Sequence, residues 1–306
     1  MSTTNILDVR NLSVSFLMYG RGLEQKEINV ISNLSLSVKE GEILAVVGSS
    51  GSGKSLLAHA ILGVLPNNAR ADGEMLYFGK KLTSEQQRLL RGKEIALVPQ
   101  SVEYLNPLMR VGKQVIGTSG KKVKQEAVFK KYGLADAVKR MYPFQLSGGM
   151  ARRVLVSTAV VSDAKLIIAD EPTPGLSKEI AHTAMGHFRS LADEGRGVML
   201  ITHDLDLALT YADRIAVFYA GTTVEIALAE DFRSGIDCLR HPYTKALWQA
   251  MPQNGFRPIE GSQPYAGDVQ KGCLFAPRCP QRTKDCNQSP SMRPLRGGEV
   301  CCSHAT

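Results

Sequence analysis

The sequence predicts an α/β protein with a mainly parallel sheet and helices on both of its faces. Short apolar runs such as "EILAVVG", "AKLIIADEP" and "GVMLITHD" have the length and composition of buried strands, and helical patterns lie between them. At 306 residues the chain can bury a large core and still carry a smaller appendage. This alternation of strand and helix is typical of parallel sheets, because parallel neighbours require a crossover connection.

The first part of the chain is predicted to be β-structure. Residues 5–47 alternate apolar and polar positions in short runs, with a turn at Lys39–Gly41. The polar, glycine-bearing stretch "LMYGRGLEQKEIN" between two of these runs is interpreted as a hairpin loop. A helical pattern follows in "KSLLAHAILGVL" and is expected to end near Pro66, because proline cannot continue a helix.

The remaining chain is predicted to contain a helical region, a strand–helix–strand unit and an extension. Residues 101–160 are expected to be mostly helical, and a helix over 178–193 separates the last two strand runs. The strand pattern then fades, which places a boundary near residue 233. The predicted domains are 1–232, with a helical subdomain at about 101–157, and 233–306.

Composition argues against several classes of protein. No apolar block follows a basic one at the amino terminus, so no secretory signal is expected, and no apolar run approaches the length of a membrane span. In such a chain, clustered cysteines more often bind metal than form disulfides. The formal net charge is +8, and the lysine-rich stretch "GKKVKQEAVFKKYG" is interpreted as a solvated helix face rather than a nucleic-acid or lipid contact.

The motif "GSSGSGKS" predicts a phosphate-binding loop between a strand and a helix, and a flexible glycine- and serine-rich loop is the alternative. Glycines let backbone N–H groups converge on phosphate oxygens at the positive end of the following helix. Lys54 is expected to neutralise the β- and γ-phosphates of ATP, and the Ser55 hydroxyl to hold Mg²⁺. The predicted nucleotide-binding residues of this loop are Gly48, Ser49, Ser50, Gly51, Ser52, Gly53, Lys54 and Ser55.

Two other strand ends carry residues suited to ATP hydrolysis. Asp170 ends the strand "LIIAD" and is placed to bind Mg²⁺ directly or through water, whereas Glu171 is placed to orient the attacking water. Adjacent buried carboxylates are unfavourable without a cation, which argues against a purely structural role. His203 ends the strand "GVMLITHD", and because neighbouring parallel strands end at one edge of the sheet, we expect it beside the carboxylates.

The string "LSGGM" at Leu146–Met150 lies between the phosphate loop and the acidic strand. A Ser-Gly-Gly turn that opens a helix is a second phosphate site. One nucleotide does not need both sites within one subunit. A dimer in which ATP lies between the loop of one chain and the turn of another would use both.

These motifs, in this order over about residues 5–230, resemble the ATP-binding-cassette (ABC) family. The resemblance implies a RecA-like parallel core, an antiparallel β subdomain and a helical subdomain, with ATP and Mg²⁺ as cofactors. It implies that Phe16 stacks on adenine, and that Gln100 contacts Mg²⁺, senses the γ-phosphate and touches membrane subunits. It also implies that Ser147, Gly148 and Gly149 clasp the ATP of the partner, and that His203 is the switch histidine of an ATPase.

The string "HPYTKAL", beginning at His241, has a plain structural interpretation as the start of a helix. Followed by "GC-x5-RCP-x5-C", it resembles the ATP-binding subunits of the oligopeptide, dipeptide and nickel importers, the D-type peptide-permease subunit in particular. Four thiolates are the ligand set of a [4Fe–4S] cluster and also of structural zinc, and free thiols are the third possibility. The resemblance favours the cluster. The predicted ligands are Cys273, Cys279, Cys286 and Cys301, with Cys302 as the alternative fourth ligand.

Two segments depart from the pattern of the family. Ser177 stands where the family usually has an aspartate that contacts the partner across the dimer. This difference suggests either that one composite ATP site is weakened or that the partner compensates. It favours an asymmetric ATPase dimer, a heterodimer of two similar chains. The run "QSVEYLNP" after Gln100 is shorter than usual, in a loop that docks on membrane subunits.

The resemblance implies an energy-coupling ATPase on the cytoplasmic face of the cell membrane. Its expected partners are a second ABC ATPase subunit, two transmembrane permease subunits and an extracytoplasmic substrate-binding protein, and no nucleic acid is expected. Peptides are the first expectation for the cargo, and nickel or a metal–chelator complex is the alternative. A soluble cassette protein acting on ribosomes or nucleic acid is the alternative from another class. A regulatory iron–sulfur sensor with a vestigial cassette conflicts with the intact site residues.

Overall fold

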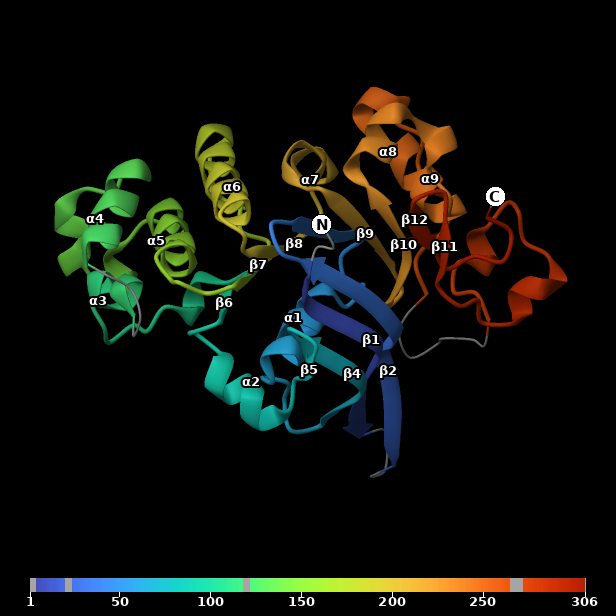
Figure 1. The fold of residues 1–306 in the computed structure, drawn as a ribbon, viewed down its shortest axis with the longest axis horizontal. Helices are drawn as coiled ribbons and strands as arrows, with labels where there is room; N and C mark the ends of the chain where they lie inside the picture. The colour runs from blue at the N-terminus through green and yellow to red at the C-terminus, as the bar shows by residue number, and fades with distance from the viewer. Residues whose placement is uncertain (1–3, 20–23, 118–121, 265–271, 306) are drawn as a thin grey trace.

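The computed structural model describes residues 4–19, 24–117, 122–264 and 272–305, which form two sheets with helices around them (Figure 1). The smaller sheet is antiparallel, in the order β2-β1-β4-β5, with β1 (Asn5–Tyr19), β2 (Gln25–Lys39), β4 (Ala69–Tyr77) and β5 (Lys80–Lys81). The larger sheet has the order β11-β12-β10-β9-β3-β8-β7-β6. Its strands are β3 (Ile43–Gly48), β6 (Ile95–Val98), β7 (Leu166–Asp170), β8 (Gly197–Thr202), β9 (Arg214–Tyr219), β10 (Thr222–Leu228), β11 (Arg293–Leu295) and β12 (Gly298–Val300).

Five strands of the larger sheet, β6, β7, β8, β3 and β9, run parallel to their neighbours in this group. Every residue of β3, β7 and β8 is buried, because helices and the second sheet cover them on both faces. The predicted α/β class with a mainly parallel central sheet is therefore confirmed.

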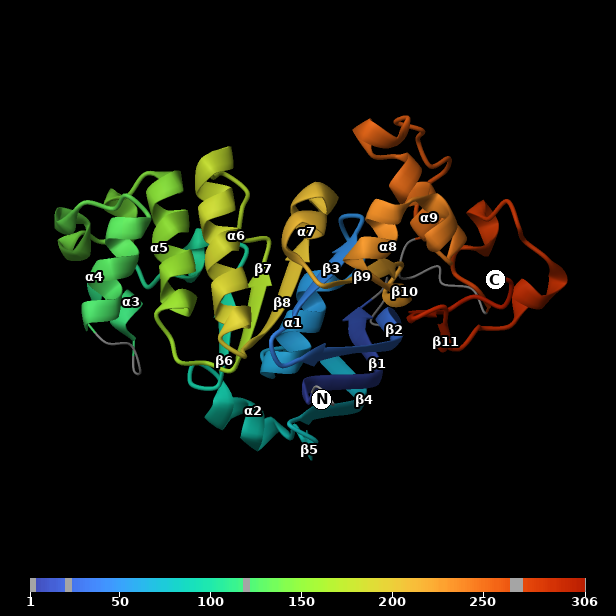
Figure 2. The same ribbon diagram turned by 45° about the horizontal axis from the view of Figure 1, so that its top comes forward.

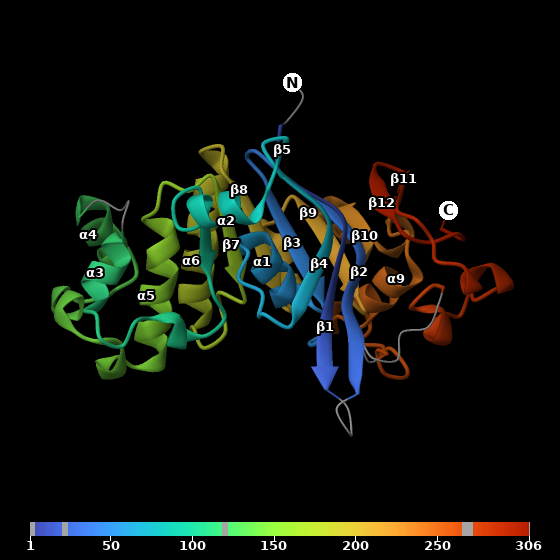
Figure 3. The same cartoon turned by 90° about the horizontal axis from the view of Figure 1, so that it is seen from below.

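The helices divide between the two faces of this sheet. The residues of α1 pack with β1 and β2 in one apolar core, so α1 lies between the sheets (Figure 3). On the other face α5, α6 and α7 lie side by side, and α3 and α4 extend this layer outward (Figure 2). The helices are α1 (Lys54–Leu62), α2 (Ser84–Leu90), α3 (Val111–Ile116), α4 (Lys122–Lys131), α5 (Gly148–Val160), α6 (Lys178–Asp193), α7 (Leu205–Tyr211), α8 (Ala229–Ser234) and α9 (Pro242–Gln249). No described helix is long and apolar enough to cross a membrane.

The predictions for individual elements differ in outcome. The helix expected over 178–193 is α6, and residues 101–160 contain α3, α4, α5 and short turns of 3-10 helix, although 118–121 lie outside the described residues. The helix expected to reach Pro66 ends at Leu62, because Gly63 takes a left-handed conformation with φ 64° and caps it.

The interpretation of "LMYGRGLEQKEIN" as a hairpin loop is wrong for most of its length. The β1–β2 ladder continues through the pairs Leu17 with Glu27 and Tyr19 with Gln25, and only 20–23 lie outside the described residues. These strand ends are largely exposed, so no buried face imposes an alternating pattern on the sequence.

The C-terminal extension completes the larger sheet. The strand β12 pairs with β10 through Glu225 with Val300 and Ile226 with Glu299, and β11 pairs with β12. The sequence did not reveal these strands, because they are three residues long and contain proline and glycine. The boundary near residue 233 stays a prediction, but strands from both sides of it, β10 and β12, pair in one sheet.

A buried ion pair fastens the extension to this sheet edge. The carboxylate of Glu225 accepts hydrogen bonds from the backbone N–H groups of Arg240 and His241, at 3.0 and 2.7 Å, and pairs with the Arg240 guanidinium at 3.2 Å. The same guanidinium pairs with Asp231 at 2.9 Å and donates to the carbonyl of Leu295 on β11 at 2.7 Å. One cation therefore connects β10, α8 and the final hairpin.

Candidate nucleotide site

The phosphate loop connects β3 to α1, as predicted. Gly51 and Gly53 have φ values of 77° and 94°, which glycine alone adopts without strain, and a Cβ on Gly48 would lie 2.5 Å from the carbonyl oxygen of Phe218. The Ser52 hydroxyl is buried and has no hydrogen-bond partner among the described residues. An unpartnered buried hydroxyl in a glycine-rich turn is consistent with a polar ligand in this loop.

Lys54 is the charged centre of the loop. Its Nζ donates to the carbonyl oxygens of Gly48 and Ser49, at 2.9 Å each. Burial lowers the pKa of Lys54, while the carboxylates of Glu171 and Asp170 act in the opposite direction. The nearby carboxylates and the burial together point to a site built around charged groups.

Asp170 ends β7 at the same edge of the sheet as the loop. It is only 3% exposed, and its Oδ1 atom has no partner within the described part of the chain. Burial raises the pKa of Asp170, and a hydrogen bond with Ser55 partly opposes this shift. A serine hydroxyl beside an unsatisfied carboxylate oxygen fits Mg²⁺, which prefers oxygen ligands.

Glu171 has a backbone conformation that is rare for a residue with a side chain. Its φ of 47° lies in the left-handed region, which costs of the order of 1–3 kcal/mol, and its N–H donates to the carbonyl of Ile201 at 2.9 Å. The side chain meets His203, whose Nδ1 lies 2.9 Å from both carboxylate oxygens. Because the carboxylate only accepts, Nδ1 carries the proton in this contact.

The Ser-Gly-Gly turn lies on the surface at the start of α5. Ser147 caps this helix by accepting the N–H of Met150 at 3.3 Å, and both Ser147 and Gly148 are exposed. A Cβ on Gly148 would meet no atom within 4 Å. In Figures 1 and 3, α5 and α1 lie in different parts of the molecule with α6 between them. The turn is therefore open to another molecule.

Comparison with known proteins identifies the family. The ABC transporter family matches residues 31–174, and the family of the oligopeptide/dipeptide transporter C-terminal region matches 224–286. The dipeptide transport ATP-binding protein DppD of Haemophilus influenzae is 36% identical, over 97% of this chain and 94% of that protein. The oligopeptide transport ATP-binding protein OppD of Salmonella typhimurium is 33% identical, over 96% and 92%. This chain is an ABC transporter ATPase.

The fold agrees with solved structures of the same family. The dimeric structure of the bacterial ABC transporter cassette MJ0796 is 25% identical, with a TM-score of 0.63 over 73% of this chain and 98% of that one. The ATPase activity follows from membership of the family, since its ATP-binding subunits hydrolyse ATP to drive transport. The roles of individual residues stay predictions, and the structure gives their positions.

Gln100 and Phe16 lie on separate elements. Gln100 is exposed and follows β6, the strand next to β7. Arg152 of α5 donates to the carbonyl oxygens of Pro99 and Pro174, at 3.2 and 3.3 Å, and so fixes the backbone before Gln100. Phe16 is half-buried on β1, at the edge of the apolar core that contains α1.

The predicted cysteine ligands are free thiols in this ABC ATPase structure. Burial raises the pKa of Cys279, and the nearby thiolates of Cys302 and Cys286 raise it further. Burial also raises the pKa of Cys301 to about 11, with smaller contributions from Cys273 and Cys302. The thiols are thus neighbours, but no three His, Cys, Asp or Glu side chains among the described residues are arranged to hold a metal ion.

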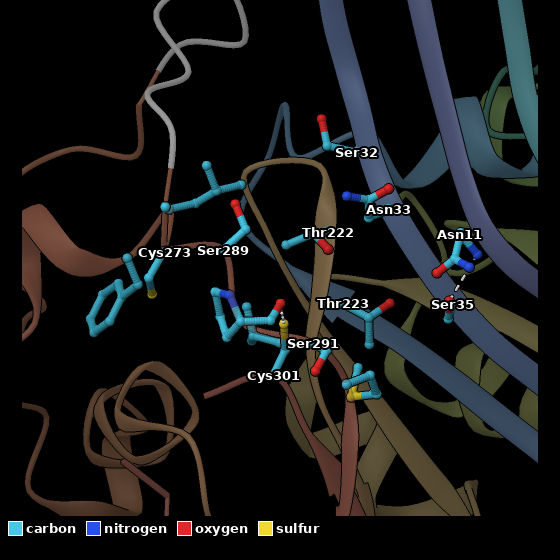
Figure 4. A pocket seen from close by; sticks show the side chains of 16 residues that line it. Asn11, Ser32, Asn33, Ser35, Thr222, Thr223, Cys273, Ser289, Ser291 and Cys301 are labelled. Atoms are coloured by element: carbon cyan, nitrogen blue, oxygen red, sulfur yellow. Dashed lines mark hydrogen bonds between the residues drawn. The ribbon is translucent and has the colours of Figure 1, made fainter. Parts of the chain in front are cut away.

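The thiols of Cys273 and Cys301 border a cavity of about 640 Å³ between the extension and the antiparallel sheet (Figure 4). Cys301 Sγ donates to the carbonyl of Pro290 at 3.2 Å, whereas Cys302 is buried elsewhere in the extension. The arrangement therefore gives the two candidates for the fourth ligand different surroundings.

Sequence reasoning missed three residues next to the phosphate loop. Gln263, Tyr243 and Arg278 border the same cavity as Gly48 and Ser49. Tyr243 lies in the string "HPYTKAL", which predicts only the start of a helix. Nothing in the sequence near Gln263 or Arg278 indicates that these residues approach the loop. No local sequence pattern could reveal these three residues, because they are far from the phosphate loop in sequence.

Proposed function

We propose that this ABC ATPase is the energy-coupling subunit of an importer for dipeptides or oligopeptides. The observation that carries the proposal is the union of two parts in one sheet. A nucleotide site of intact composition stands on β3, β7 and β8, and the region that matches the peptide-transporter family, residues 224–286, begins in β10 of the same sheet. Relatives with this full-length organisation are named for dipeptide and oligopeptide transport.

We propose that ATP binds with its phosphates in the loop and that Ser55, Asp170 and Gln100 hold Mg²⁺, which would draw charge from the phosphates. Lys54 neutralises the β- and γ-phosphates. Glu171 accepts a proton from the attacking water, and His203 holds the Glu171 carboxylate in place through Nδ1. The 2.9 Å contact between the last two residues supports this pairing of roles.

We propose that two similar chains close on ATP, each offering Ser147, Gly148 and Gly149 to the loop of the other. The exposure of this turn at the start of a 13-residue helix supports the arrangement. Ser177 caps α6 by accepting the N–H of Ile180 and so has a local structural role in place of a carboxylate at the dimer contact. We propose that the second chain is a different ABC ATPase, so that the dimer is a heterodimer. The serine at position 177 in place of the usual aspartate supports this asymmetry.

An exposed apolar surface after Gln100 supports docking to permease subunits. Tyr104 is 61% exposed and Leu108 88% in the segment after Gln100, and a contiguous exposed apolar patch is typical of an interaction site. We propose that this surface receives two transmembrane permease subunits at the cytoplasmic face of the membrane. An extracytoplasmic binding protein would then deliver the cargo, and no nucleic acid takes part.

Uptake in cells that carry Lys54→Ala in this chain tests the cargo. Loss of the Lys54 charge removes the main attraction for the β- and γ-phosphates, so transport should fall to the background level. We expect uptake of a labelled dipeptide or short oligopeptide to be lost, while uptake of labelled nickel is unchanged. Loss of nickel uptake alone would overturn the peptide assignment and favour a metal importer. Stimulation of ATP hydrolysis by RNA or DNA, without copurifying permease subunits, would favour a soluble cassette protein.

We also propose that the extension holds a [4Fe–4S] cluster through Cys273, Cys279, Cys286 and either Cys301 or Cys302, with zinc as the alternative. Burial raises the pKa values of Cys273 and Cys279, and Cys286 and Cys302 raise both further, which places these thiols in one region of the extension although the described side chains are not arranged around a metal ion. Cys302 raises the pKa of Cys279, and Cys273 raises that of Cys301, so both candidates for the fourth ligand lie near members of the set. The cluster would order the extension and take no part in hydrolysis.

Replacing Cys279 with Ser tests the cluster. In protein purified without oxygen, we expect the iron content to fall to near zero and residues 272–305 to become more sensitive to proteases, because thiolates order this short segment. Cys238→Ser is the matched control, since Cys238 lies apart from the group in sequence. Iron content and protection equal to the wild type in the Cys279 variant would contradict the cluster, and stoichiometric zinc would replace it.

A further inference from the structure

A segment of the C-terminal extension lies against the phosphate loop of the same chain. Ser49 Oγ donates a 2.5 Å hydrogen bond to Gln263 Oε1, although the two residues are 214 positions apart. Residues 259–263, here called the strap, line one cavity of about 380 Å³ with the start of the loop and with His203. The extension therefore reaches the side of the site where the γ-phosphate would lie.

Arg278 fixes the strap. Its Nε donates to the carbonyl of Glu260 at 2.7 Å, and its second terminal nitrogen donates to the carbonyls of Ile259 and Gly261, at 3.2 and 3.0 Å. The guanidinium also lies over the ring of Tyr219 on β9, 5.8 Å from its centre. Three consecutive carbonyl groups are thus held by one planar fork, a geometry that lysine cannot reproduce.

Ser49 is the point where the extension and the loop meet. Tyr243, a second residue of the extension, lines the same cavity as Ser49; burial raises the pKa of Tyr243, and Ser49 partly opposes this shift. The carbonyl of Ser49 accepts from Lys54 Nζ at 2.9 Å and from the N–H of Ser52 at 3.3 Å. Ser49 therefore contacts the strap through its hydroxyl and positions Lys54 through its carbonyl group.

We propose that Gln263 and Arg278 are positioning residues for ATP binding, and that the strap holds the phosphate loop in its receptive shape before the nucleotide arrives. A loop that is ordered in advance pays less conformational entropy when its ligand binds. Gln263 acts through Ser49, and Arg278 acts through the backbone of the strap. The inference rests on the assignment of Gly48–Ser55 as the ATP loop.

The test compares Gln263→Ala with Gln281→Ala in the full-length chain and in the assembled complex. Gln281 is an exposed glutamine of the same extension and serves as the matched control. We expect the Gln263 variant to raise the Kd for a fluorescent ATP analogue, and the KM for ATP, by about three- to tenfold, the loss typical of one hydrogen bond, with kcat unchanged. Arg278→Lys should raise the same two constants, because it keeps the charge but loses the fork.

A double-mutant cycle separates positioning from general destabilisation. In a chain with Ser49→Ala, the further change Gln263→Ala should have little added effect on Kd, because the contact is already lost. Additive effects, an unchanged Kd, or a fall in kcat alone would overturn the proposal. Lys54→Ala tests the assignment of the ATP loop separately from the role of the strap. If this variant binds ATP as the wild type does, the loop assignment fails, and the inference about the strap fails with it.

Discussion

Replacing Glu171 with Gln should lower kcat for ATP hydrolysis by a factor of about 10²–10⁴, the range typical of a lost general base. The amide keeps the shape of the side chain but cannot accept the proton of the attacking water. It can still accept a hydrogen bond from His203 Nδ1 through its oxygen, so the geometry of the pair at 2.9 Å should persist. The measurement is phosphate release by the assembled complex at saturating ATP.

The same variant should retain ATP binding, because Lys54 and the loop are untouched. We expect ATP to remain trapped between two closed subunits, seen as a stable dimer in size-exclusion chromatography. Glu85→Gln, an exposed carboxylate at the start of α2, is the control for a loss of charge and should behave as the wild type. Turnover in the Glu171 variant at half the wild-type rate or more would mean that this chain's own site contributes little to the hydrolysis measured in the assembled complex.

Replacing Arg240 with Ala should lower the free energy of unfolding by about 3–5 kcal/mol, the cost typical of breaking a buried ion pair. The side chains of Arg240 and Glu225 are 1% and 0% exposed, so the carboxylate would lose its cation without gaining water. The carbonyl of Leu295 would also lose its donor. Denaturant unfolding checks the stability, and limited proteolysis should show early release of the C-terminal hairpin.

Arg10→Ala is the matched control for this change. Arg10 pairs with Asp8 and Glu74, but its side chain is 54% exposed, and ion pairs of this kind contribute about 0–1 kcal/mol. The loss in the free energy of unfolding for Arg240→Lys should lie between those of Arg240→Ala and Arg10→Ala. The positive charge remains in this variant, while the bonds to Asp231 and to the hairpin are lost. Equal stability of the Arg240 and Arg10 variants would contradict the fastening role of the buried pair.

The positions of the predicted nucleotide-site residues follow from the sequence because each part of this site is local. Asp170 ends a buried strand, Lys54 and His203 come after two others, and parallel strands in the order β3-β8-β7 bring those ends to one edge. The pattern that identifies each strand also gives the position of its functional residue. The contact of His203 with Glu171 follows from this register alone.

The missed features depend on packing between distant segments. The contact of Gln263 with Ser49, and the pairing of β12 with β10, join residues that no local pattern connects. Exposed strand ends such as those at Tyr19 and Gln25 lack a buried face, so their sequence resembles that of a loop. The cysteine spacing indicated a cluster of thiols but could not rank Cys301 against Cys302, because adjacent residues have the same spacing to the others.

The order of synthesis gives the β10–β12 pairing a further consequence. The strand that covers the edge of β10 lies at Gly298–Val300, so a chain emerging from the ribosome presents an uncovered edge until the extension that follows β10 has also been made. Open strand edges are templates for pairing with other chains, and incomplete chains are prone to aggregate in this way. The extension thus closes this edge of the sheet against self-association. A chain terminated early would carry a nucleotide loop of normal sequence on a sheet left open at one side.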